Sequence, residues 1–206
     1  FSSLNGTNIG DFGGAVAPTS DVDPDLKPER AKELEYGIDI GLFNGRVTLE
    51  LTQYNKVISD LILPLVPSPS TGVSTITTNA AEMSNKGTEV ALTLIPVQNR
   101  NFSWNSRVLW WKNSTELTEL AIPAQTNTFY AAAVFGATRI EKGVSPTGIY
   151  GYLADGSRDI IGDLQPDFQM SFANDFDFLR GFTASFLLHW SQGAKGINLT
   201  QLLYDE

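Results

Sequence analysis

Three pairs of segments in this chain alternate apolar and polar residues, the pattern of β-strands whose two faces meet different surroundings. From Leu34 to Phe43 the even positions are apolar, and the odd positions before Phe43 are charged or glycine. Asn44-Gly45 follows, and this pair favours hairpin turns because both residues tolerate a positive φ. The alternation resumes from Val47. We therefore predict an antiparallel hairpin over about 34–56.

Two further hairpins are predicted by the same alternation. The second covers about 86–112, with a short polar turn at 98–101. The third covers about 167–192, where apolar residues run from Phe168 to Phe178 and from Phe182 to Trp190 around a turn at 179–181. The expected fold class is all-β, with six antiparallel strands.

The connections between the hairpins are expected to be long. Segments 59–83 and 113–165 show no strong period, and prolines, serines and threonines are frequent in the first of them. Residues 1–30 are expected to be loop, and a short helix is expected near 131–134. Outer-membrane barrels combine short turns on the periplasmic side with long loops outside. No apolar run reaches the ~18 residues of a membrane-spanning helix.

The alternation separates an apolar face from a polar face. An apolar face turned to lipid would carry aromatic residues near the strand ends, at the membrane interfaces. The expected lipid-facing residues are Ile38, Ile40, Leu49, Leu92, Val108, Phe172, Phe186 and Leu188. The expected interfacial aromatic residues are Phe43, Trp104, Trp110, Phe168 and Trp190. Trp111 would point the opposite way from Trp110, into the barrel, and is the candidate substrate contact.

A soluble β-sandwich is the alternative, because its strands also alternate. Such a module could bind carbohydrate through Trp110 or Trp111. Charged residues make up 18% of the chain, below the roughly 25% usual in soluble domains. The formal net charge of −9 argues against binding to nucleic acid or to an anionic membrane surface. The absence of cysteine excludes disulfides and thiolate zinc sites.

Candidate catalytic and metal-binding residues have simpler explanations. Asp21, Asp23 and Asp25 resemble the start of a calcium loop, but Leu26 and Lys32 stand where such a loop needs Gly and Glu. His189 is the only histidine, so no histidine cluster can bind zinc. Six carboxylates are expected to be solvated residues of the polar face: Glu35, Asp39, Glu50, Glu89, Asp175 and Asp177. We therefore expect no catalytic, cofactor or metal site.

Four segments stand out in order along the chain: Asp23-Pro24-Asp25-Leu26-Lys27-Pro28-Glu29 followed by Leu34–Arg46, then Asn85-Lys86-Gly87-Thr88-Glu89-Val90, Ile149-Tyr150-Gly151-Tyr152, and Ile161-Gly162-Asp163-Leu164-Gln165-Pro166-Asp167-Phe168. They resemble motifs of the SusC/RagA family of TonB-dependent outer-membrane transporters. Pro28 departs from the pattern, because the family usually has an aromatic residue there.

This resemblance implies part of a large transmembrane β-barrel of about 22 strands, closed around a plug. The plug and the TonB box are expected to lie outside this chain, which would be a fragment of the later barrel. The implied role is import of large nutrients, glycans or peptides, in the outer membrane and without catalysis. The implied partners are a SusD-like surface lipoprotein, TonB and outer-membrane lipid.

Overall fold

The computed structural model describes residues 5–9, 12–16, 20–122, 125–127, 137–179 and 181–196. Strands dominate this part of the chain, and a single 3-10 turn, η1 (Pro69–Thr71), is the helical element among these residues. Within the same ranges, no helix is long and apolar enough to cross a membrane.

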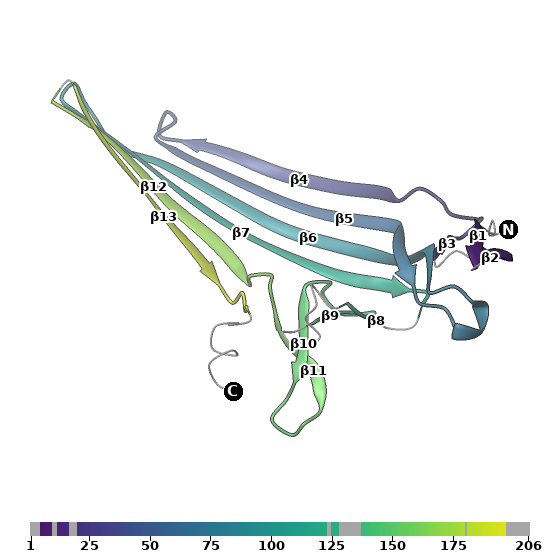
Figure 1. Ribbon diagram of the computed structural model, residues 1–206. Coiled ribbons are helices and arrows are strands. Elements are labelled where there is room, and N and C mark those ends of the chain that lie inside the picture. Colours follow the sequence, from purple (N-terminus) through teal and green to yellow (C-terminus); the bar gives the residue numbers. More distant parts are fainter. Residues whose placement is uncertain are drawn as a thin grey trace.

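The main sheet is formed by three antiparallel hairpins that lie side by side (Figure 1). Its strands, in spatial order, are β13 (Phe182–Gln192), β12 (Phe168–Phe178), β7 (Phe102–Leu120), β6 (Thr75–Gln98), β5 (Val47–Leu65) and β4 (Arg30–Leu42). A short strand, β3 (Ser20–Val22), pairs in parallel with β6 outside this order. The pairs β4–β5, β6–β7 and β12–β13 correspond to the three hairpins that the alternation predicts.

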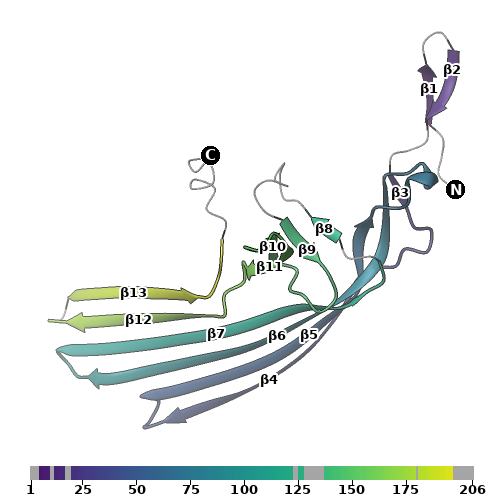
Figure 2. The same ribbon diagram turned by 90° about the horizontal axis from the view of Figure 1, so that it is seen from below.

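The main sheet is one curved layer (Figure 2). Among the described residues, the buried hydrophobic side chains are few: Ala80, Ala81, Leu117 and Ile149. Large apolar side chains of the strands are exposed instead, such as Leu34 at 67% and Leu188 at 61%. A β-sandwich buries such side chains between two sheets. No second sheet covers the apolar face within the described ranges, so the sandwich alternative is not favoured.

The expected loop at 59–83 is wrong in extent. β5 continues to Leu65 and β6 begins at Thr75, so only 66–74 connect them. The added segments place apolar residues at successive positions, as in Leu61-Ile62-Leu63 and Ala80-Ala81, and therefore show no two-residue period, but their backbones still pair along the ladder.

Pro64 can lie inside β5, although proline has no N–H, because its nitrogen points away from β6. The N–H of Ile62 points away from β6 and donates to the Glu29 side chain. Pro64 lies two residues further and its nitrogen points the same way, where β4 no longer runs beside β5. The proline therefore costs no hydrogen bond to β6.

The expected loop at 113–165 is also wrong in extent. β7 continues to Leu120. Four short strands follow and form a second sheet in the order β11-β10-β9-β8, and Figure 2 shows it on one side of the main sheet. These strands are β8 (Gln125–Asn127), β9 (Ala137–Ile140), β10 (Gly148–Tyr152) and β11 (Arg158–Asp163). The helix expected near 131–134 lies outside the described residues.

The first thirty residues are not wholly loop as expected. β1 (Asn5–Ile9) pairs with β2 (Phe12–Val16), and Ile9 lies opposite Phe12. The sequence between them is Gly10-Asp11, a pair that hairpin turns favour. The prolines of this region lie outside both strands, so they do not prevent this pairing.

The turn after β4 lies where Asn44-Gly45 predicts it, but it is longer. It comprises four residues, and φ is positive at Phe43 (52°), Asn44 (55°) and Gly45 (84°). Phe43, expected to end the strand, therefore belongs to the turn. Hydrogen bonds from the Gly45 N–H to the Leu42 carbonyl (3.1 Å) and from the Arg46 N–H to the Phe43 carbonyl (3.3 Å) hold it.

Candidate functional site

The register of the main sheet aligns the expected lipid-facing residues. One continuous row crosses all six long strands, each member paired with the next. It consists of Ile40, Leu49, Leu92, Val108, Phe172 and Leu188. Ile38 and Phe186 lie two residues along their strands and therefore share this face. We call it the apolar face.

Four expected interfacial aromatic residues lie on the apolar face, namely Trp104, Trp110, Phe168 and Trp190. Trp104 stacks on Phe176 with ring centroids 5.7 Å apart, near the end of the sheet that carries the short turns. Trp110 stacks on Phe168 at 6.3 Å, further toward the opposite end. We call these two ends the turn end and the loop end. Two levels of aromatic rings thus delimit the apolar band.

The apolar band stops abruptly toward the loop end. The row Tyr36, Gln53, Thr88 and Lys112 already carries polar groups on this face. The Tyr36 hydroxyl and the Gln53 side chain are hydrogen-bonded at 2.7 Å. β5, β6 and β7 continue well beyond this row, so the sheet extends past its own apolar band.

Asn174 is a polar residue on the apolar face that the alternation did not single out. It is only 1% exposed, and Ser106 lies opposite it on β7. The Trp104 indole N–H donates to Asn174 Oδ1 at 2.8 Å. The one sequence signal was a gap in the apolar alternation between Phe172 and Phe176.

The opposite face of the main sheet is polar. All six carboxylates expected there lie on it by register: Glu35, Asp39, Glu50, Glu89, Asp175 and Asp177. Arg107 approaches Glu50 with Nη2 and Oε2 4.0 Å apart. Among the described residues, no three His, Cys, Asp or Glu side chains are placed to hold a metal ion. The polar face therefore carries mainly acidic side chains, with a few isolated basic groups between them.

Trp111 lies on the polar face, as expected from its position next to Trp110. Its ring is 5.7 Å from the His189 ring, and Glu89 lies opposite it in register. Trp111, Glu89, Glu50 and Arg107 contribute to a hollow of about 370 Å³. An aromatic ring beside carboxylates and a guanidinium can stack on a sugar ring or bind the side chains of a peptide. Alternation places Trp111 on this face, but its neighbours come from three other strands.

Gly87, in the second family-like segment, lies beneath the ring of Tyr54. A Cβ at this position would overlap the tyrosine ring. Tyr54 and Gly87 are paired across β5 and β6 on the polar face. The glycine therefore creates the space that the aromatic ring fills.

The first family-like segment forms a strap, residues 23–29, tied to β5 and β6. Asn79 Oδ1 accepts from the Lys27 N–H at 2.6 Å, and Asn79 Nδ2 donates to the Lys27 carbonyl at 2.8 Å and to the Asp60 carbonyl at 2.6 Å. Glu29 accepts from the Ile62 N–H at 2.8 Å, beside a bulge in β5. A hydrogen bond from Thr78 lowers the pKa of Asp23.

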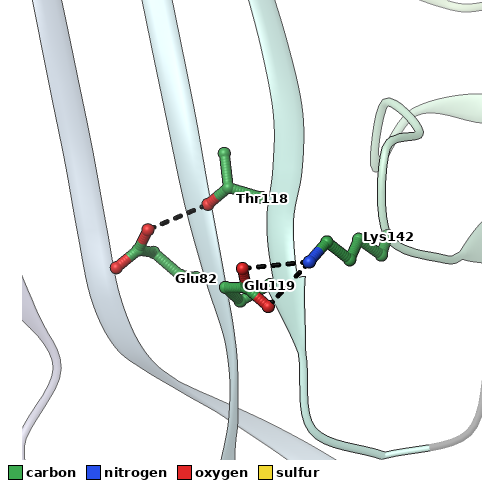
Figure 3. A network of polar contacts seen from close by, with 4 residues as sticks. All are labelled: Glu82, Thr118, Glu119 and Lys142. Carbon is green, nitrogen blue, oxygen red and sulfur yellow. Dashed lines mark hydrogen bonds and ion pairs between the residues drawn. The ribbon is translucent and has the colours of Figure 1, made fainter.

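The second sheet is attached to the loop end of the main sheet. Lys142 donates to both carboxylate oxygens of Glu119 at 2.9 Å, while Thr118 donates to Glu82 at 3.0 Å across β6 and β7 (Figure 3). The Gly143 N–H donates to the Leu117 carbonyl at 2.8 Å. Side-chain and backbone contacts thus both hold the segment after β9 against β7.

Asp163, in the last family-like segment, organises the return to β12. Burial raises its pKa, but hydrogen bonds from Thr147 and from the Gln165 N–H outweigh this and hold the pKa below its ordinary value. The Asp163 carbonyl also accepts from the Lys195 N–H at 2.7 Å. One aspartate therefore joins β11, the loop before β10 and the segment after β13.

Comparisons with known proteins agree with this architecture. The family model described as TonB dependent receptor-like, beta-barrel matches residues 1–201. TonB-dependent receptor P39 of Formosa agariphila is 32% identical over 155 residues, 74% of this chain and 14% of that protein. TonB-dependent receptor SusC of Bacteroides thetaiotaomicron is 29% identical over 97 residues, 46% of this chain and 10% of SusC. A solved structure of the RagAB peptide transporter matches with a TM-score of 0.72 and 18% identity, over 94% of this chain and 24% of the matched chain.

The chain thus spans a minor part of each curated relative, 14% of P39 and 10% of SusC. The solved structure shares the fold, and the family model covers nearly the whole chain. The resemblance to SusC/RagA proteins is confirmed, and the chain belongs to the family of TonB-dependent receptor β-barrels.

Proposed function

We propose that the whole protein to which this chain contributes is an active transporter of the outer membrane. It imports large nutrients, glycans or peptides, together with a SusD-like surface lipoprotein, and it is not an enzyme. Energy reaches it through TonB, by way of segments beyond this chain. The family consists of outer-membrane proteins, and the RagAB neighbour is named a peptide transporter.

The observation that carries this proposal is that the main sheet has one apolar face and one polar face. We call this two-sided sheet the wall. The apolar face, with its row from Ile40 to Leu188, contacts outer-membrane lipid. The polar face lines the interior of the barrel. The turn end faces the periplasm, and the loop end faces outward with the second sheet.

The hollow beside Trp111 is the substrate contact that we propose within this wall. Trp111, His189 and Glu89 come from three strands and meet on the interior face. They lie nearer the loop end than Glu50 and Arg107. The ring offers a stacking surface, and the charged groups offer hydrogen bonds to hydroxyl or peptide groups. This combination suits a large polar solute.

Uptake by living cells tests the proposal. Cells that carry the full-length gene should accumulate a labelled oligosaccharide or peptide, and cells that lack the gene should not. A protonophore should abolish accumulation while surface binding persists, because TonB draws on the inner-membrane proton gradient. Equal accumulation with and without the gene, for both classes of solute, would refute the transport function.

A pair of tryptophan variants tests the contact itself. Trp111→Ala should weaken solute binding about five-fold, since an aromatic contact is worth about 1 kcal/mol. Trp190→Phe alters a tryptophan of the apolar face that does not line the hollow and should leave binding unchanged. Equal binding by both variants would place the substrate contact elsewhere in the transporter.

A further inference from the structure

The three short turns of the main sheet share a positive charge, to which the proposed transport function assigns no role. The sequence places one arginine in each of them, Arg46, Arg100 and Arg180, and no acidic residue in any. This is notable in a chain whose net charge is −9. Arg180 lies outside the described residues. Among those described, neither Arg46 nor Arg100 takes part in an ion pair.

The turn after β4 also borders an apolar hollow. It has a volume of about 420 Å³ and is lined by Phe43, Arg46, Val47, Leu94, Ile95 and Pro96. Val47 and Leu94 are paired on the apolar face. The exposed Arg46 is the charged residue of this lining.

An irregularity of β6 shapes this hollow. Leu94 pairs with Ser106 and Val97 with Trp104, so two residues of β6 face one residue of β7. The Ile95 N–H donates to the Arg46 carbonyl at 2.8 Å, which draws the bulge toward the turn. The hollow is therefore lined by the turn after β4, the start of β5 and the last part of β6.

We propose that this hollow binds an anionic phospholipid of the periplasmic leaflet, such as phosphatidylglycerol. Arg46 holds the phosphate, because a guanidinium matches phosphate oxygens with two parallel hydrogen bonds. Val47, Leu94 and Pro96 contact the start of the acyl chains. The location supports this occupant, since the hollow lies where the apolar band ends and the positive charge begins. The inference rests on the proposed outer-membrane location.

Lipid binding to the full-length protein, purified in non-ionic detergent and titrated with phosphatidylglycerol, tests this site. Native mass spectrometry resolves each bound lipid. Arg46→Gln should weaken one binding step about five-fold, because one arginine near a membrane surface is worth about 1 kcal/mol. Leu94→Trp should do the same by filling the hollow without changing the charge. Arg30→Gln, at the opposite end of β4, is the matched control and should bind as the wild type does.

Three outcomes would overturn the proposal. They are equal binding by Arg46→Gln and Arg30→Gln, unchanged binding by Leu94→Trp, and competition by glycerol 3-phosphate as strong as that of the lipid, which would indicate a free-phosphate site. Heat-modifiable gel mobility verifies that each variant has folded. Solute uptake should persist in Arg46→Gln, so a failure of the lipid site and a failure of the transport function give different results.

Discussion

Gly87 and Tyr54 show how one residue makes room for another on the polar face. Tyr54 covers the glycine from the neighbouring strand, and a Cβ at position 87 would overlap its ring. A glycine inside a strand weakens it by exposing backbone, and an aromatic ring across the strands restores that protection. The Asn-Lys-Gly segment of the family resemblance thus has a packing reason at its third residue.

Gly87→Ala should destabilise the barrel by about 1–3 kcal/mol, the usual cost of overpacking. The loss is measured as a shift in the thermal midpoint of heat-modifiable mobility of the full-length protein. Gly41→Ala is the control, because a Cβ there meets nothing within 4 Å. Adding Tyr54→Ala to Gly87→Ala should remove the clash. A loss that Gly41→Ala matches would argue against the packing explanation.

Asn174 illustrates the opposite case, a polar side chain kept on an apolar face. Trp104 donates to its Oδ1, and Phe176 stacks on both Trp104 and Phe186 around it. A buried amide costs free energy unless it is hydrogen-bonded, and Trp104 meets part of that need. Whether or not Trp104 lies at the membrane interface as predicted, its indole N–H has a second role, because it hydrogen-bonds a buried amide.

At the scale of elements, the strap joins the start of the chain to the loop ends of β5 and β6. Asn79 binds the backbone on both sides of it, at Lys27 and at Asp60. Asp60 has a positive φ of 59° and lies at the bulge of β5. The strap therefore compensates for an irregular stretch where β4 no longer pairs with β5.

Asn79→Ala should loosen the strap without unfolding the wall, because it removes three hydrogen bonds worth about 1 kcal/mol each. Hydrogen exchange of the Lys27 amide should accelerate, while the amides of the membrane-spanning strands keep their protection. Thr77→Ala is the control, since the Asp23 N–H donates to the backbone carbonyl of residue 77, which persists. Unchanged exchange at Lys27 in Asn79→Ala would contradict the assigned role.

At the scale of the whole molecule, the wall has one apolar face, for which we propose lipid contact, and one polar face. The six-strand row from Ile40 to Leu188 shows that this division is continuous across the sheet rather than a property of separate hairpins. The apolar band ends at the row of Tyr36 and Lys112, whereas β5, β6 and β7 continue beyond it. We therefore expect the portion with the apolar band to lie in the membrane and the portion beyond it to lie outside.

Arginine at Leu49 should cost about 2–4 kcal/mol in the bilayer, whereas arginine at the adjacent Thr48 should cost much less. The physical reason is that Leu49 lies in the apolar row and Thr48 lies on the polar face. Leu92 and Phe172 should behave like Leu49. Thr93 is a poorer control than Thr48, because Arg107 lies directly opposite it. Unfolding free energies in lipid vesicles provide the measurement, and equal costs at Leu49 and Thr48 would contradict a lipid-facing wall.

The residue pattern alone determined the all-β class, the three hairpins and the face on which each strand residue lies. Alternation is a local property, since two successive side chains of a regular strand point to opposite faces. Ile40 and Trp111 could therefore be assigned to faces without knowing any partner strand. The family-like segments added what the alternation left open, the choice between lipid and a soluble core.

Only the tertiary structure decided where the strands end and what each residue meets. The outer parts of β5 and β6 place apolar residues at successive positions, as in Leu61-Ile62-Leu63 and Ala80-Ala81, so they carry no two-residue period, and the backbone pairing between the two strands defines them. The contacts of Gly87 with Tyr54, of Asn79 with the strap and of Trp111 with His189 join residues far apart in sequence. Such contacts depend on the register between neighbouring strands, which the alternation within one strand does not specify.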